Sequence, residues 1–133
     1  MPVHDPERVL VVEDNDLNYE LVRFILGKMG LIVLRASHSE QVLDLVLNER
    51  PRLIYMDIQL PGMGGLELTR LLKGNSATRD IPVIALTAFA MVGDEEKALA
   101  AGCDAYLTKP VSPHQLQDTT QQFLEPLRRR GVA

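Results

Sequence analysis

Short apolar runs alternate with longer amphipathic stretches along this chain. The runs are nearly continuous in apolar residues, whereas a strand with one solvated face would alternate apolar and polar positions. This pattern is typical of parallel strands that helices cover on both faces. We therefore predict five strands, of which the last is the weakest: residues 9–12, 32–34, 53–56, 83–86 and 105–107.

The stretches between these runs have the apolar spacing of helices. In the first stretch, apolar residues recur at intervals of three and four up to Met29, and Gly30 follows where a C-terminal cap is expected. Capping serines, prolines and further glycines delimit the other helices. The predicted helices span residues 17–29, 39–47, 66–73, 94–101 and 112–124.

Strand and helix alternate five times, which predicts an α/β fold. Parallel strands joined by right-handed crossovers form an open sheet, and five such units are too few to close an eightfold barrel. We expect a (βα)5 doubly wound parallel sheet with the flavodoxin-like strand order 2-1-3-4-5 and helices on both faces. The length of 133 residues is that of one domain.

Composition and charge narrow the class of protein. The chain has 46% apolar residues and a net charge of -4, whereas a general binder of nucleic acid or of anionic membranes would normally be basic. Cys103 is the only cysteine, which excludes a multi-cysteine metal site and fits a reducing compartment. The first residues lack the apolar core of a leader, and no stretch approaches about 18 uninterrupted apolar residues. We expect a cytoplasmic protein that does not span a membrane.

Polar residues stand at the carboxyl ends of the predicted strands, where open α/β sheets bind their ligands. These residues are, in chain order, Glu13, Asp14, Asp57, Thr87 and Lys109. In the expected strand order the first and third strands are neighbours, so the three acids would lie close together and repel one another. Hard oxygen ligands with no His or Cys nearby favour magnesium, or manganese. The sequence therefore predicts a divalent-metal site.

Asp57 is the best-placed nucleophile among these acids. It follows the apolar run 53–56 and precedes the loop 58–65, which contains proline and glycines, so it should stand rigidly at a strand end. A carboxylate can attack phosphorus and form an acyl phosphate when metal and lysine neutralise the charge of the transferring group. A main-chain carbonyl of the loop would complete the metal shell.

Four short motifs, each at the end of a predicted strand, carry a resemblance to a known family. They are Val-Val-Glu-Asp-Asn at 11–15, Met-Asp-Ile-Gln-Leu-Pro-Gly-Met at 56–63, Leu-Thr-Ala at 86–88 and Thr-Lys-Pro at 108–110. Together they resemble the signature of response-regulator receiver domains, the CheY-like superfamily. The resemblance spans about residues 8–125 and implies a single receiver domain over 1–133 with a short C-terminal tail. Asn15, Asn18 and the segment 87–91 resemble most closely single-domain cell-cycle regulators and the receivers of hybrid kinases.

The resemblance implies roles for the acidic positions. Asp57 would accept a phosphoryl group, and Asp14 and Asp57 would ligate magnesium directly. Glu13, which stands where many receivers carry Asp, would hold the metal largely through water. Gln59 would add its main-chain carbonyl to the metal shell.

The same resemblance implies roles for four further residues. Thr87 would donate a hydrogen bond from its hydroxyl to one phosphoryl oxygen, and Lys109 would pair with another. Tyr106 would be the aromatic side chain that changes rotamer on activation. Pro110 would follow a cis peptide bond.

Partners also follow from the resemblance. The phosphoryl donor would be a sensor histidine kinase or a histidine phosphotransfer protein. A downstream protein would read the signal from the face formed by 94–101, 105–107 and 112–124. No DNA-binding output is expected after Leu124, so we expect contact with proteins and not with nucleic acid or membrane. The chain would not be an enzyme in the ordinary sense, although it would catalyse its own phosphoryl transfer and slow autodephosphorylation.

Two other classes of function remain open. A flavodoxin-like module for a small ligand would need a phosphate-cradling loop after the first strand, but Glu-Asp-Asn-Asp at 13–16 would repel a phosphate without metal. An aspartate-nucleophile phosphatase would normally carry a second acid shortly after the nucleophile, and Ile58 and Gln59 do not supply one. The acids also have a purely structural alternative, because Asp14 or Asp16 could cap the first helix.

Overall fold

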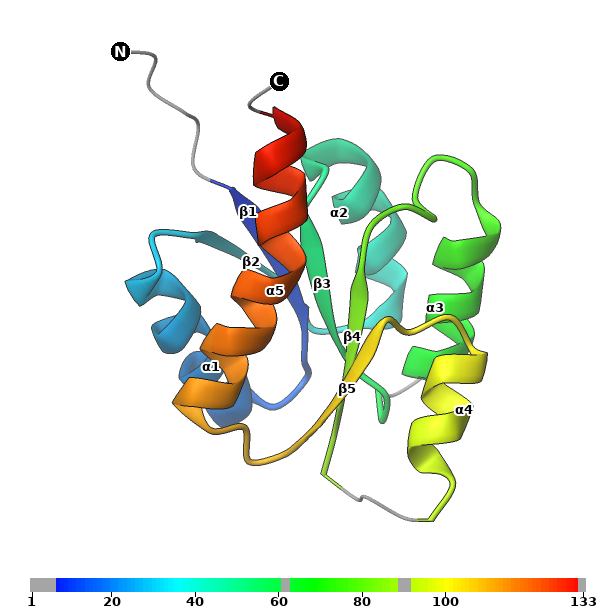
Figure 1. Cartoon of the computed structure of the whole chain (residues 1–133). Helices are drawn as coiled ribbons and strands as arrows, with labels where there is room; N and C mark the ends of the chain where they lie inside the picture. Colours follow the sequence, from blue (N-terminus) through cyan, green and yellow to red (C-terminus); the bar gives the residue numbers. More distant parts are fainter. Residues whose placement is uncertain (1–6, 61–62, 89–91, 132–133) are drawn as a thin grey trace.

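The computed structural model describes residues 7–60, 63–88 and 92–131, with 125–131 described by their backbone alone. Its five strands are all parallel and form one sheet in the order β2-β1-β3-β4-β5 (Figure 1). The strands are β1 (Arg8–Val12), β2 (Ile32–Ala36), β3 (Leu53–Asp57), β4 (Val83–Thr87) and β5 (Ala105–Thr108). The predicted strand order is confirmed, and each strand end lies within two residues of its predicted position.

Helices cover both faces of this sheet. They are α1 (Asp16–Lys28), the 3-10 turn η1 (Ser39–Gln41), α2 (Val42–Glu49), α3 (Gly65–Gly74), α4 (Asp94–Ala100) and α5 (Pro113–Gly131). α1 and α5 lie on one face, and α2, α3 and α4 lie on the other (Figure 1). The doubly wound arrangement is therefore confirmed. Among the described residues, none of the helices combines the length and apolar character that crossing a membrane requires.

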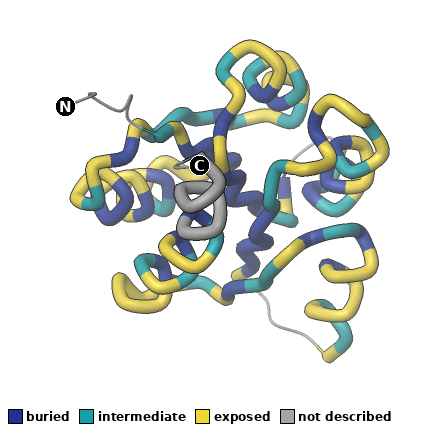
Figure 2. Tube along the Cα trace, turned by 45° about the horizontal axis from the view of Figure 1, so that its top comes forward, coloured by how far each residue is buried: buried dark blue, intermediate teal, exposed yellow. Residues whose placement is uncertain are grey.

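Two hydrophobic clusters hold the three layers together. Alternate residues of β1 enter opposite clusters: Val9 and Val11 pack with α1 and α5, whereas Leu10 and Val12 pack with α2, α3 and α4. All four side chains are fully buried. Buried positions follow the strands and the inner sides of the helices, and exposed positions lie on the outer turns (Figure 2). Burial on both faces is the physical reason for the continuous apolar runs.

Local hydrogen bonds determine where α1 begins and ends. Asn15 is its N-cap, because the side-chain oxygen of Asn15 accepts a hydrogen bond of 2.9 Å from the N–H of Asn18. Capping by Asp14 or Asp16 is therefore wrong. At the other end Gly30 has a φ of +80°, a left-handed conformation that ends the helix at little steric cost.

Two helices differ from their predicted bounds by more than one residue. The predicted helix 39–47 begins with η1, where the Gln41 side chain accepts main-chain N–H groups of the preceding loop, so the α-helix starts only after this turn. α5 continues to Gly131, beyond the predicted end at 124. Apolar spacing marks the buried face of a helix, whereas main-chain hydrogen bonds can continue without apolar side chains.

Candidate functional site

Polar side chains gather at the edge of the sheet where the strands end. Glu13 follows β1, Asp57 ends β3, Thr87 ends β4, and Lys109 follows β5. The register pairs Asp57 with Leu86, the residue directly before Thr87. The fold therefore brings together residues that are up to 96 positions apart in the sequence, counted from Glu13 to Lys109.

Three acids form a compact group at this edge. Glu13, Asp14 and Asp57 each offer a carboxylate oxygen, and these oxygens all lie within 4.8 Å of one another. Glu13 and Asp57 are almost completely buried, with 1% and 3% of their surface exposed, whereas Asp14 is exposed. We call these three residues the acidic group. Two of its carboxylates are thus shielded from water, and the third is exposed to water.

The ammonium group of Lys109 reaches into the acidic group. Its Nζ lies 2.5 Å from Glu13 Oε1 and 3.3 Å from Asp57 Oδ2, and only 12% of the lysine side chain is exposed. Glu13 Oε1 has no hydrogen bond of standard geometry, so the contact with Lys109 is an ion pair rather than a well-directed bond. One positive charge therefore faces two buried carboxylates, and the site carries excess negative charge.

Burial and the neighbouring charges affect the ionisation of Glu13. The pKa of Glu13 is raised from its ordinary value of 4.5 to about 7, chiefly by burial. The Asp57 carboxylate contributes to this rise, and the Lys109 ammonium opposes it. A divalent cation would relieve the same repulsion by binding between the carboxylates.

The carboxylate of Asp57 is held in a defined orientation. Its Oδ1 accepts a hydrogen bond of 2.9 Å from the main-chain N–H of Gln59, while Oδ2 faces Lys109. The start of α3 lies very close to the main chain at the end of β3. A Cβ at Gly65 would lie 2.4 Å from the main-chain oxygen of Asp57 and 2.6 Å from Ile58 Cα. Only glycine fits at this position, so Gly65 lets the helix pack against the end of β3.

Thr87 and Tyr106 lie on β4 and β5, the two strands that follow β3 in the sheet. Thr87 is fully buried, and Tyr106 stands on β5 in register with Ala85 of β4. Tyr106 Oη is buried without a hydrogen bond of standard geometry. Burial raises the pKa of Tyr106, the charges of Asp94 and Glu95 raise it further, and contact with the Thr87 hydroxyl lowers it. The ring therefore lies close to both Thr87 and the start of α4.

The main chain around Lys109 is also closely defined. The N–H of Lys109 donates a hydrogen bond of 2.7 Å to the carbonyl of Thr87, which continues the pairing of β5 with β4. The peptide bond between Lys109 and Pro110 is cis. The hydrogen bond to Thr87 holds the main chain of Lys109 beside the end of β4.

The donor set of the acidic group fits a hard divalent cation. It consists of carboxylate oxygens, and within the described part of the chain it contains neither His nor Cys. Magnesium and manganese prefer such ligands. The buried Glu13 Oε1, which lacks a well-directed hydrogen bond, is the kind of atom that a bound cation or its water would satisfy.

Comparison with known proteins assigns the chain to a family. The family model described as the response regulator receiver domain matches residues 9–121. The chain belongs to this family. Receiver domains are signalling modules of two-component systems, and the resemblance seen in the four motifs is confirmed.

Individual receivers support the assignment along most of the chain. The polar-differentiation response regulator DivK of Brucella anthropi is 46% identical over 119 residues, which cover 90% of this chain and 97% of that protein. The receiver domain of a sensor histidine kinase from Pseudomonas aeruginosa PAO1, with a magnesium ion coordinated in its active-site cleft, is 33% identical with a TM-score of 0.83. That match covers 91% of this chain and 99% of the Pseudomonas chain. A receiver domain of a histidine kinase from Syntrophus aciditrophicus is 31% identical with a TM-score of 0.85, covering 92% and 93%.

Two residues that contact the main chain of this site were not recognised in the sequence. Gly65 belongs to a Gly-Gly pair of a kind that is common in loops. Its role is apparent only in the structure, where a Cβ at this position would lie 2.4 Å from the main-chain oxygen of Asp57. Arg35 lies on β2, far from every motif, yet it contacts the loop that carries Glu13 and Asp14. The motif segments 61–62 and 89–91 lie outside the described residues.

Proposed function

We propose that this receiver is a phosphoacceptor response regulator whose acceptor is Asp57, and that the transfer depends on magnesium or manganese. The observation that carries the proposal is the environment of Asp57. Its carboxylate is 3% exposed, accepts the N–H of Gln59 and faces both Lys109 and the other acids. This environment suits a nucleophile that needs a defined orientation and a source of positive charge.

The proposed reaction transfers a phosphoryl group from a phosphohistidine. An oxygen of Asp57 forms a bond to phosphorus while the P–N bond of the donor breaks, and the electron pair remains on the imidazole. The donor is a sensor histidine kinase or a histidine phosphotransfer protein. The product is an acyl phosphate, which water later hydrolyses to phosphate and the free carboxylate.

Residues of the chain supply charge for this transfer. Lys109 pairs with one oxygen of the transferring group, and the hydroxyl of Thr87 donates to another. Asp14 and Asp57 would hold the metal directly, Glu13 would hold it largely through water, and the main-chain carbonyl of Gln59 would complete the shell. When bound, the metal would neutralise charge on the transferring oxygens.

The signal would leave the site through Thr87 and Tyr106. A new phosphoryl group would draw the Thr87 hydroxyl toward it, and the half-buried ring of Tyr106 would move into the released space. Two charge-assisted hydrogen bonds contribute about 1.5–3 kcal/mol each, and a shift from 1:99 to 99:1 needs about 5.5 kcal/mol. The resulting change would be read by a protein partner at the face of α4, β5 and α5.

The relatives favour a single-domain regulator over the two alternative classes. DivK is matched over 97% of its own length. A flavodoxin-like ligand module would place an anion at an edge that already carries three acids. For an aspartate-nucleophile phosphatase, Ile58 and Gln59 after the nucleophile supply no acid to protonate a leaving group.

Phosphorylation by a small donor tests the proposal. The native chain is incubated with acetyl phosphate and Mg²⁺, quenched rapidly in acid, and measured as intact mass beside Asp57→Asn. We expect the mass of one phosphoryl group on the native chain, none without Mg²⁺, and none on the variant. An unmodified native chain, or equal modification of the variant, would contradict the assignment of Asp57.

Thr87→Ala separates acceptance from signalling. The variant should still take up the phosphoryl group, because Asp57 and Lys109 are unchanged, but its Tyr106 should no longer respond. Amide and aromatic NMR signals of α4 and β5, compared with and without Mg²⁺ and beryllofluoride, measure the response. A native-sized change in the variant would argue against this route.

A further inference from the structure

The guanidinium group of Arg35 clasps the turn that carries two of the three acids. Its Nε and Nη2 each lie 3.2 Å from the main-chain oxygen of Glu13, and Nη2 lies 3.4 Å from that of Asp14. Nη2 also donates to the Asp16 carboxylate at 2.7 Å. The side chain is 28% exposed, although it carries a full charge. One side chain of β2 thus contacts two residues of the turn between β1 and α1 and the first residue of α1.

Further contacts restrict the position of this guanidinium. It lies over the ring of Tyr19, 4.5 Å from the ring centroid, and Tyr19 is itself buried in the core between the sheet and α1. The N–H of Glu13 donates to Ala36, the residue after Arg35, at 3.0 Å. Both main-chain polar groups of Glu13 are therefore bonded to β2. The β1–α1 turn is attached to the sheet at its carbonyls as well as at its amide.

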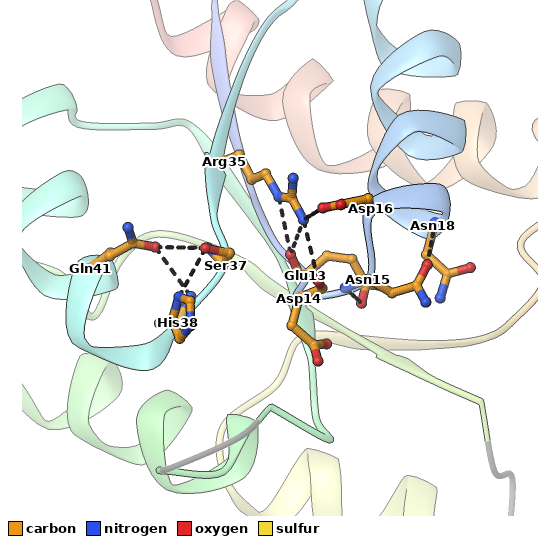
Figure 3. A network of polar contacts seen from close by, with 9 residues as sticks. All are labelled: Glu13, Asp14, Asn15, Asp16, Asn18, Arg35, Ser37, His38 and Gln41. Atoms are coloured by element: carbon orange, nitrogen blue, oxygen red, sulfur yellow. Dashed lines mark hydrogen bonds and ion pairs between the residues drawn. The ribbon is translucent and has the colours of Figure 1, made fainter.

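This attachment determines where the acidic side chains project. Figure 3 shows Arg35 on one side of the turn, in contact with the carbonyls, and the carboxylate of Asp14 pointing away from it. The Glu13 side chain is bonded on the same turn, since its Oε2 accepts the N–H of Asn15 at 3.2 Å. Rotation of either peptide would swing a carboxylate away from Asp57.

We propose that Arg35 is a positioning residue for the cation site: by bonding the carbonyls of Glu13 and Asp14 it holds their carboxylates toward Asp57 and strengthens Mg²⁺ binding. This inference rests on the proposed function. This positioning role and a general effect of charge predict opposite changes in Mg²⁺ affinity when Arg35 is removed. A positive charge beside a cation site repels the cation, so removing Arg35 would tighten Mg²⁺ binding if charge alone mattered. Removing an orienting contact weakens metal binding instead.

The test compares two arginines that each contact an acid. Arg35→Met removes one charge and the contacts with the turn, whereas Arg23→Met removes one charge and an exposed pair with Glu20 at 2.8 Å. Mg²⁺ affinity is measured by calorimetry on the full chain at a pH above the Glu13 pKa of about 7. We expect affinity about 10-fold weaker in Arg35→Met, within the range for outer-shell partners, and nearly unchanged affinity in Arg23→Met.

Arg35→Lys and an NMR readout separate orientation from folding. Lysine keeps the charge but lacks the fork that reaches the Glu13 carbonyl twice, so its affinity should fall between those of the native chain and Arg35→Met. The amide signals of Asp14 and Asn15 in the metal-free protein should shift in both Arg35 variants, while those of β4 stay in place. Melting temperatures without metal monitor folding, and if Arg35→Met does not fold, Arg35→Lys decides.

The outcomes distinguish this inference from the proposed function. Native or tighter Mg²⁺ affinity in a folded Arg35 variant overturns the positioning role and leaves Asp57 phosphorylation unaffected as a proposal. A native chain that binds no Mg²⁺ overturns the metal-dependent function and the role of Arg35 together. Equal weakening in Arg23→Met would show that any lost arginine has this effect, and would also overturn the inference.

Discussion

Lys73 and Lys109 pair with acids at opposite edges of the same sheet. Lys73 Nζ donates to the main-chain carbonyls of Arg79 at 3.2 Å and Ile81 at 2.9 Å, and to Asp104 at 2.9 Å. Asp104 also accepts the N–H of Val83, the first residue of β4, at 2.8 Å. One lysine thus pairs with one acid, and its other N–H groups donate hydrogen bonds to neutral main-chain carbonyls. This lysine–acid pair is balanced in charge.

The carboxyl edge has the same residue types in a different ratio. Lys109 faces the two buried acids Glu13 and Asp57, and the exposed Asp14 lies in the same group. Burial is the main cause of the raised pKa of Glu13, and the neighbouring Asp57 carboxylate adds to it. A satisfied lysine–acid pair ties loops together, whereas an unbalanced one attracts a cation or a phosphoryl group with its metal. The ratio of charges distinguishes the partly exposed Lys73 pair from the Lys109 site that we propose to be functional.

The largest expected effect is on phosphoryl transfer in Lys109→Met. Loss of the Lys109 ammonium group, which lies 3.3 Å from Asp57 Oδ2, should slow phosphorylation by acetyl phosphate about 100-fold to 1000-fold, as for other donors to a developing charge. Initial rates from quenched samples and intact mass measure the effect. A variant that is phosphorylated at the native rate would mean that the charge ratio at the carboxyl edge has no catalytic meaning.

Lys73→Met should show the opposite profile. The transfer rate should stay close to native, because Lys73 contacts only the amino edge, but the free energy of unfolding should fall by about 2 kcal/mol through lost charge-assisted bonds. Urea titration followed by circular dichroism gives the stability, and the phosphorylation assay gives the rate. A large rate loss with unchanged stability would reverse the comparison.

The last expected effect is a pH dependence of the free energy of unfolding that arises from Glu13. Its folded-state pKa of about 7 lies above the ordinary 4.5, so the metal-free folded protein binds more protons than the unfolded chain between these values. Stability should therefore fall as pH rises through this window, by about 1–3 kcal/mol in total. The native stability minus that of Glu13→Gln, measured by urea titration without metal, isolates this contribution. A difference that stays flat or rises with pH would contradict the raised pKa.

Local patterns predicted the elements because each pattern has a local physical cause. The continuous apolar run at 53–56 reflects a strand covered on both faces, and Gly30 ends α1 because glycine tolerates a φ of +80°. The N-cap was harder, since Asp14, Asn15 and Asp16 are all good caps. Only the path of the turn made Asn15 the residue whose oxygen meets the Asn18 N–H.

The sequence by itself determined the class of fold and the edge at which Glu13, Asp14, Asp57 and Lys109 would meet. It did so because parallel strands place their carboxyl ends on one side, whatever their separation along the chain. The tertiary structure decided which distant groups contact one another, because the spacing of residues along the chain does not indicate these contacts. The contact of Arg35 with the Glu13 and Asp14 carbonyls depends on the β2–β1 register and on three-dimensional packing. The difference between a balanced Lys73 and an unbalanced Lys109 likewise depends on which carbonyls and carboxylates the folded chain brings within reach of each ammonium group.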